Sequence, residues 1–551
     1  MTHGSFDDIN EAMFERLLDL NPGLATTLGK HVPYDDLLPH GGFETLSDTY
    51  ELLKDWRARA RRAAEGEELS IDQTLGLRNL DFSVELYGFS IYDYPMWKMN
   101  PGAIEMPGDL LFLMITRDYA PLEDRLTSIT SRLSKMPTYL EQFQTRIEVG
   151  SQVRLWTQMA IESTELFPEF LEFILSRAKG NVAPDLETAL ADEIGCVKTA
   201  LEGHTTWLKG LLKTAVDDFA MGEDRFAELM WIRGLGYTPD EMLAMGERYL
   251  RELGEQRTEV ARRIAPDADI VEAVRRVQAD APRTFEEGLA ATKAEMERAR
   301  HYLVDRGIAT MDPDAMLSVV ETPRFMASVL PYAALQMPCK FEEGKRGEYM
   351  VTRPKDLRDL GSHLNYGSIL NTAVHEAFPG HFHQGIESDK RHWMLQLSAI
   401  LAIYDIQSIA AETVEGWAHY CEKMMYDHGY GTSDPAVFEM INGAIFRAYR
   451  IIADVRLARG EATVDEMVDM AMEVAGLPRD AAVAEVRRYS KTPGQPLSYL
   501  VGRHIMMGFR GELETELGER FDERRFHDLL ASYGYLPIPL ALEGVRRGMT
   551  D

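Results

Sequence analysis

Apolar residues recur every three to four positions along most of the chain, a spacing that predicts α-helices with one buried face. The clearest start is Thr238, which can cap a helix that has Pro239 in its first turn, while Glu241 completes a capping box. Similar patterns predict helices near 46–64, 121–148, 153–179, 183–214, 269–306, 393–427, 434–458, 463–475, 478–490 and 496–518. These stretches together predict a mainly α protein.

Two regions depart from the helical pattern. Residues 317–322 are rich in β-branched side chains, and residues 339–342 and 348–351 flank a turn-like Glu-Gly-Lys-Arg-Gly sequence. They predict a small antiparallel sheet just before residue 371. Residues 88–118 are rich in aromatic residues, proline and glycine, and we expect an ordered loop there.

The charge and cysteine content narrow the possible partners and the compartment. A formal net charge of -30 repels nucleic acid and anionic membranes, so neither is an expected partner. The cysteines, Cys196, Cys339 and Cys421, show no C-x-x-C spacing, which argues against a disulfide framework and a cysteine-ligated zinc site. No leader-like segment or long apolar run is present. These features predict a soluble, cytoplasmic protein.

Histidines are concentrated in one part of the chain. Seven of the 14 lie between His363 and His428, where an even spread would put about two. Clustering of this kind is typical of a metal site or a catalytic centre, although surface histidines could also produce it.

The densest part is His375-Glu376-Ala-Phe-Pro-Gly-His381. Histidines six residues apart point about 240° apart around an unbroken helix, so they could not share an ion there. Pro379 and Gly380 break the helix, because proline disfavours helical backbone before it and glycine can take a positive φ. We expect the helix to end near Ala377 and His381 to return to the side of His375. His383 is a weaker ligand candidate.

A later apolar segment, residues 397–425, supplies further ligand candidates. Glu412, Glu415 and His419 are spaced i, i+3 and i+7, so they share one face of a predicted helix. Buried carboxylates in such a helix require a cation, although an acidic stripe facing solvent would show the same spacing. Zinc in a catalytic site takes three protein ligands and leaves a fourth position open.

Four segments, HEAFPGHFHQ (375–384), VEGWAHYCE (414–422), TPGQPLSYLVG (492–502) and FHDLLASYGYLPIPL (526–540), resemble a bacterial family known as domain of unknown function 885. The family is similar to helical zinc metallopeptidases, and the likeness runs over nearly the whole chain. It implies a large, multi-helix, two-lobed metallopeptidase-like fold, with an N-terminal helical lobe at 1–225 and a metal-binding catalytic lobe at 226–551.

The resemblance also implies roles for individual residues. His375, His381 and Glu415 are implied as metal ligands and Glu376 as general base. Many relatives have a second histidine where this sequence has Phe382, which cannot bind metal. Glu412 and His419, one turn either side of Glu415, are expected to orient the ligands.

A looser likeness to helical oligopeptidases concerns residues 498–510. It implies Tyr499 as a hydrogen-bond donor to the oxyanion that forms during amide hydrolysis. Arg503, His504 and Arg510 are expected to bind a substrate carboxylate, although ordinary packing and surface ion pairs would explain them equally well.

These observations predict a metallopeptidase with one zinc ion per chain that cleaves short peptides as an oligopeptidase or exopeptidase. One alternative is a metal-dependent hydrolase or lyase of a small non-peptide amide or ester, because it would use the same residues. A second alternative is a protein that binds zinc without catalysis. The sequence leaves open the peptide specificity, the physiological metal and the oligomeric state.

Overall fold

Local capping chemistry determines where several helices begin. Thr238 accepts a hydrogen bond from the backbone N–H of Glu241, and the Glu241 side chain accepts from the N–H of Thr238, so the capping box predicted there is confirmed. The same reciprocal pattern starts helices at Ser5, Ser70 and Thr463.

The computed structural model describes residues 5–266, 268–323, 333–401 and 410–550, and helices dominate them, which confirms the mainly α class.

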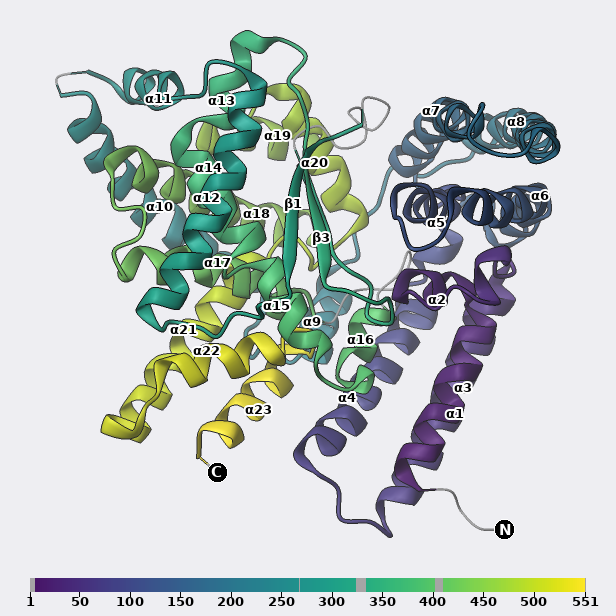
Figure 1. The fold of residues 1–551 in the computed structure, drawn as a ribbon, viewed down its shortest axis with the longest axis horizontal. Coiled ribbons are helices and arrows are strands. Elements are labelled where there is room, and N and C mark those ends of the chain that lie inside the picture. Colours follow the sequence, from purple (N-terminus) through teal and green to yellow (C-terminus); the bar gives the residue numbers. More distant parts are fainter. Residues whose placement is uncertain (1–4, 267, 324–332, 402–409, 551) are drawn as a thin grey trace.

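The N-terminal helices lie together on one side of the molecule (Figure 1). Their apolar faces form two clusters, one between α1, α3 and α4 and one between α5, α6, α7 and α8. The bounds are α1 Phe6–Leu20, α2 Pro22–Leu28, α3 Phe43–Ala64, α4 Ile71–Gly88, α5 Glu105–Thr116, α6 Leu122–Arg146, α7 Arg154–Ala178 and α8 Pro184–Leu211.

The loop expected at residues 88–118 is partly helical, so that prediction was wrong. α4 continues into a π-helical turn at Phe89–Asp93, and α5 begins at Glu105. Pro107 is compatible with α5 because it falls in the first turn, where a backbone N–H has no partner inside the helix. The apolar residues that follow it, among them Leu110 and Met114, are buried.

The second half of the chain contributes the remaining helices (Figure 1). Residues 269–306, predicted as one helix, form two, because Pro282 interrupts the pattern and Thr284 caps a new start. Residues 402–409 of the helix predicted at 393–427 lie outside the described residues. The bounds are α9 Glu223–Ile232, α10 Pro239–Ile264, α11 Ile270–Ala279, α12 Phe285–Arg306, α13 Leu360–Leu364, α14 Tyr366–Thr372, α15 His381–Asp389, α16 Leu397–Ile400, α17 Ala411–Asp427, α18 Asp434–Arg459, α19 Val464–Ala475, α20 Arg479–Lys491, α21 Ser498–Leu517, α22 Glu523–Ser532 and α23 Ile538–Thr550.

A small sheet of three strands, β1 Met316–Glu321, β2 Ala333–Gln336 and β3 Arg346–Val351, has the order β1-β3-β2. β3 pairs with β1 in parallel and with β2 in antiparallel register. The prediction of a purely antiparallel sheet was therefore wrong, and so was the strand predicted at 339–342. The antiparallel partner of β3 is β2, which ends at Gln336. The connection from β2 to β3 is longer than the predicted tight turn.

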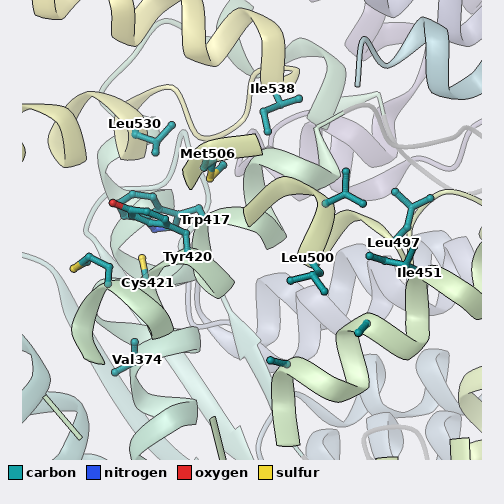
Figure 2. Close-up of a cluster of buried hydrophobic side chains, with 14 of the residues drawn as sticks. Val374, Trp417, Tyr420, Cys421, Ile451, Leu497, Leu500, Met506, Leu530 and Ile538 are labelled. Carbon is teal, nitrogen blue, oxygen red and sulfur yellow. The ribbon is translucent and has the colours of Figure 1, made fainter. Parts of the chain in front are cut away.

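One hydrophobic core cluster includes buried residues of α17 and α21. Figure 2 shows Trp417 and Tyr420 of α17 close to Met506 of α21 and Leu530 of α22, and all four are buried. Near the N-terminal helices, Trp393 stacks on Phe14 with ring centroids 4.0 Å apart. A segment of the second half thus packs into the first, while the division at residue 225 stays a prediction. Among the described helices, none is long and apolar enough to cross a membrane.

Candidate metal centre

The segment between α14 and α15 folds back on itself. α14 continues into a π-helical turn, Ala373–Ala377, after which Phe378 is extended and the Phe378–Pro379 peptide bond is cis. The backbone N–H of Gly380 donates to the carbonyl of Val374 at 3.0 Å, and α15 begins at His381. The helix end predicted near Ala377 is confirmed. π-Helical turns of this kind are frequent at functional sites.

Gly380 is required here for space. Its φ is -64°, so the positive φ considered for this glycine is not used. A Cβ atom at this position would lie 1.7 Å from the carbonyl oxygen of His375 and 2.5 Å from that of Val374. Only a residue without a side chain lets the backbone pass this close, and the close passage brings His381 next to His375.

His375, Glu376 and His381 form a compact group of possible metal ligands. One ligand atom from each lies within 4.8 Å of the others. The two imidazole rings are nearly perpendicular, at 87°, with centroids 4.9 Å apart. The expected convergence of the two histidines is thus present. His383 lies outside this group, and burial lowers its pKa to about 3.

Glu415 of α17 reaches the same group. Its Oε2 lies 3.2 Å from His381 Nε2, which is close enough for an ion pair, and although burial lowers the pKa of His381, Glu415 raises it above its ordinary value. Two atoms bound to one tetrahedral zinc ion at about 2.05 Å are about 3.3 Å apart, so the observed separation fits a pair of ligands. Burial alone would raise the pKa of Glu415, but the nearby His381 and His375 lower it to about 2.

Two glycines let α17 and α21 cross in close contact. A Cβ on Gly416 would lie 2.6 Å from the Cα of Gly502, and a Cβ on Gly502 would lie 2.2 Å from the carbonyl oxygen of Glu412. Any larger residue at either position would push the helices apart. The crossing holds the first turn of α21 beside Glu415.

Tyr499 lies in that first turn of α21. Its ring is nearly parallel to that of His375, at 11°, with centroids 6.4 Å apart. The guanidinium of Arg450 lies over the same ring, with its central carbon 4.6 Å from the ring centroid. Burial and the charge of Glu415 raise the pKa of Tyr499, so the hydroxyl keeps its proton and can donate a hydrogen bond.

A carboxylate that the sequence analysis missed, Glu422, lies behind the histidines. Its Oε1 is 2.7 Å from His375 Nδ1 and its Oε2 is 3.2 Å from His419 Nδ1. Arg447 of α18 lies 3.0 Å from Glu422 Oε1. Burial would raise the pKa of Glu422, but Arg447 and the histidines hold it well below its ordinary value. The signal was available, because Glu422 lies seven residues after Glu415, on the same helix face.

The two residues expected to orient the ligands are placed differently. His419 is fully buried, donates from Nδ1 toward Glu422, and accepts at Nε2 from Arg503 at 3.1 Å, while burial lowers its pKa to about 3. Glu412 points away from the histidines and lies 2.5 Å from Arg233, and both side chains are buried. The observed partner of Glu412 is therefore Arg233, and Glu412 is absent from the group of possible metal ligands among the described residues.

The three residues expected to bind a substrate carboxylate do not come together. Arg503 contacts His419 behind the ligand group. His504 Nδ1 lies 2.9 Å from the Tyr249 hydroxyl. Arg510 is held by the Tyr420 hydroxyl at 2.9 Å and by the carboxylate of Glu523. None of the three lines the cavity described next.

An open cavity of about 320 Å³ gives access to the ligand group. Its walls combine the polar residues with apolar ones from β2, α17 and the segment after α22. The lining residues are Leu335, Met337, His375, Glu376, His381, Gln384, Val414, Glu415, Tyr499 and Tyr535.

The chain is thus a mainly helical protein with a His/Glu/His group that can hold a metal ion beside an open cavity. Two imidazoles and a carboxylate are ligands that suit a divalent cation such as zinc. The protein belongs to the DUF885 family, described as bacterial proteins of unknown function, whose model matches residues 22–544.

Two solved structures have the same fold. One is a candidate lipoprotein of unknown function from Shewanella oneidensis, with 20% identity and a TM-score of 0.79. The other is a candidate lipoprotein from Colwellia psychrerythraea, with 17% identity and a TM-score of 0.80. Each comparison covers 98% of this chain and 99% of the other chain. No curated protein matches the chain.

Proposed function

We propose that the protein is a zinc-dependent hydrolase of peptide bonds in short peptides, with one ion held by His375, His381 and Glu415. The observation that carries this proposal is the convergence of His375, Glu376 and His381, whose ligand atoms lie within 4.8 Å of one another, with Glu415 Oε2 3.2 Å from His381 Nε2. A buried carboxylate needs a cationic partner, and a metal ion bound by Glu415 and both histidines would supply one.

Zinc in a site of this kind lowers the pKa of a water molecule and polarises the scissile carbonyl. Glu376 belongs to the ligand group but follows His375 directly, and we assign it the role of general base. Its carboxylate accepts a proton from the attacking water and delivers that proton to the leaving amine nitrogen. A base and a ligand differ in what their loss removes: loss of the base abolishes cleavage, whereas loss of the ligand also removes the zinc.

The protonated Tyr499 hydroxyl is the candidate donor to the oxyanion. It lines the same cavity as Glu376 and Glu415. A donor that is fixed before the reaction stabilises the transition state by roughly 3–4 kcal/mol. Arg450, which lies over the Tyr499 ring, restricts the position of that ring.

The sheet offers a way to hold an extended peptide. β2 is at one end of the strand order, and among the described residues only β3 pairs with it. Leu335 of β2 also lines the cavity. A peptide added along this edge would lie beside the ligand group, and short flexible chains suit such a site better than folded proteins.

Elemental analysis of the purified protein and mass-spectrometric profiling of a mixed short-peptide library test the proposal. We expect about one zinc per chain, and loss of cleavage with retained zinc in Glu376→Gln. Glu255→Gln, at an exposed position on α10, is the matched control and should cleave like wild type. Zinc binding without cleavage of any peptide would reject peptides as substrates, and absence of zinc after reconstitution would reject the metal site.

The ligand assignment has its own test. Glu415→Gln should lose most bound zinc, whereas Glu412→Gln should keep it, because Glu412 faces Arg233. If Glu412→Gln loses zinc and Glu415→Gln does not, the third ligand has been assigned wrongly.

The location of the protein is a separate matter, on which two observations differ. The three cysteines are unpaired, as in proteins of reducing compartments. Both solved structures, however, are described as candidate lipoproteins. Fractionation of cells that express the natural gene would decide between the cytoplasm and the cell envelope.

A further inference from the structure

We propose that the cavity selects peptides with an uncharged, apolar side chain next to the scissile bond, through a wall formed by Leu335, Met337, Val414 and Tyr535. This inference rests on the proposed function, because it assigns the substrate class of the same site. Its evidence is the set of apolar residues that line the cavity together with the candidate ligands.

The first part of this apolar wall lies one turn from a candidate ligand. A Cβ on Gly385 would lie 2.1 Å from the terminal methyl of Met337 and 3.0 Å from the Tyr535 hydroxyl. Gly385 is four residues after His381 on α15, so the two share a helix face and are about 6 Å apart along the axis. Met337 and Tyr535 therefore close the cavity within one side-chain length of the ligands.

The second part lies near the proposed base. Leu335 pairs with Tyr349 of β3, and the pKa of buried Tyr349 is raised by burial and by the charge of Glu376. Leu335 in β2 and Met337, the first residue after that strand, both line the cavity. Val414, directly before Glu415, completes the wall on the α17 side.

The polar groups of the cavity leave no counterion for an acidic substrate side chain. Among the described residues that line it, none is lysine or arginine, and Glu376 and Glu415 would repel a carboxylate. Gln384 is fixed, because its Nε2 donates to the carbonyl of Thr413 at 3.0 Å. Its Oε1 is then available to accept a hydrogen bond from a backbone N–H of the peptide.

The size of the pocket can be changed at Met337. Met337→Ala removes the side chain that reaches Gly385, while its backbone carbonyl can keep its bond to Arg117. We expect kcat/KM for peptides with tryptophan relative to alanine beside the cleaved bond to rise by about tenfold or more, with unchanged zinc content. The control is Met507→Ala, at an exposed position on α21, which should keep the wild-type ratio.

Wild-type cleavage sites should carry leucine, methionine or phenylalanine on one side of the cut bond. Cleavage that is equally frequent next to glutamate, or an unchanged ratio in Met337→Ala, would overturn the inference. A binding measurement separates this failure from failure of the proposed function. Zinc-loaded Glu376→Gln should bind the tripeptide Ala-Leu-Ala at least about tenfold more tightly than Ala-Glu-Ala. That preference without any cleavage by wild type would reject the hydrolase and keep the pocket, whereas equal binding would reject the pocket.

Discussion

His375 Nδ1 lies 2.7 Å from Oε1 of Glu422, and both side chains are buried. When Nδ1 carries the proton and donates it to the carboxylate, Nε2 is free to bind a metal ion. Arg447 lies 3.0 Å from the same oxygen and balances the charge of Glu422. The pairing therefore fixes the orientation of a candidate ligand.

Glu422→Gln should weaken zinc binding by about 10–100-fold, because the neutral amide orients His375 less firmly and makes it a poorer ligand. Competition with a chelator of known affinity at constant pH would measure the change. Glu255→Gln serves as the control on an exposed helix face. Equal zinc affinity in the two variants would contradict a role of Glu422 in the site.

Gly380→Ala should destabilise the protein by about 1–3 kcal/mol or more, because the new Cβ would collide with the carbonyl of His375 and displace the turn. Zinc content should fall as well, since His381 would move away from His375. Gly508→Ala on α21 is the control, because nothing lies within 4 Å of its Cβ and alanine favours the helix by up to about 1 kcal/mol. Urea unfolding of both variants checks the prediction, and similar effects of the two substitutions would refute it.

Gly502→Ala should push α21 away from α17, because its Cβ would lie 2.2 Å from the carbonyl oxygen of Glu412. Tyr499 would then leave its place beside Glu415, and peptide cleavage should fall at least about tenfold, since a displacement of about 1 Å can cost about 100-fold in rate. Gly511→Ala, in open space on the same helix, should have no such effect. Unchanged kcat/KM in Gly502→Ala would show that the close crossing is not needed for activity.

Arg233→Met should destabilise the protein by about 3–5 kcal/mol, because it leaves the buried Glu412 without its cation. The double variant Arg233→Met/Glu412→Gln should recover part of this loss, since no unpaired charge would stay buried. The free energies of unfolding in urea would show the recovery. A double variant as unstable as the single one would mean that the ion pair is not the cause.

His31 makes stability depend on pH between about 6.5 and 9. Burial alone would lower the pKa of His31, but Asp35 and Glu342 raise it to about 9, above the ordinary value of 6.5. The raised pKa means that protonated His31 stabilises the folded state below pH 6.5, and that this contribution is lost as the pH rises through about 9. His31→Gln should therefore have a lower Tm than wild type at pH 6, and a smaller difference at pH 10. The exposed His301→Gln is the control, and a difference that does not change with pH would contradict the prediction.

The local features of this protein could be predicted from its sequence. The capping box at Thr238 and the helix end near Ala377 depend on residues a few positions apart, and both are present. The return of His381 toward His375 is also local, because Pro379 and Gly380 allow only a short turn between them. A positive φ was the expected reason for glycine at position 380, but the structure shows that close backbone contact requires it.

Features that join distant segments could not be predicted in the same way. The parallel pairing of β1 with β3 depends on packing across about 30 residues, whereas the sequence showed only a turn between neighbouring segments. Arg447 reaches Glu422 from α18, and nothing in the local sequence of either residue indicates the other. His504 and Arg510 are near Tyr499 in the chain, yet they point to Tyr249 and Tyr420.

The sequence by itself determined most of the helices, the break between the two histidines and the face of α17 that carries Glu415, because backbone preference and side-chain spacing act over a few residues. Only the tertiary structure decided which residues support the ligands, how the strands pair and what lines the cavity. These features depend on contacts between distant segments. One example is the crossing of α17 and α21 at Gly416 and Gly502, where the absence of side chains lets the helices approach closely.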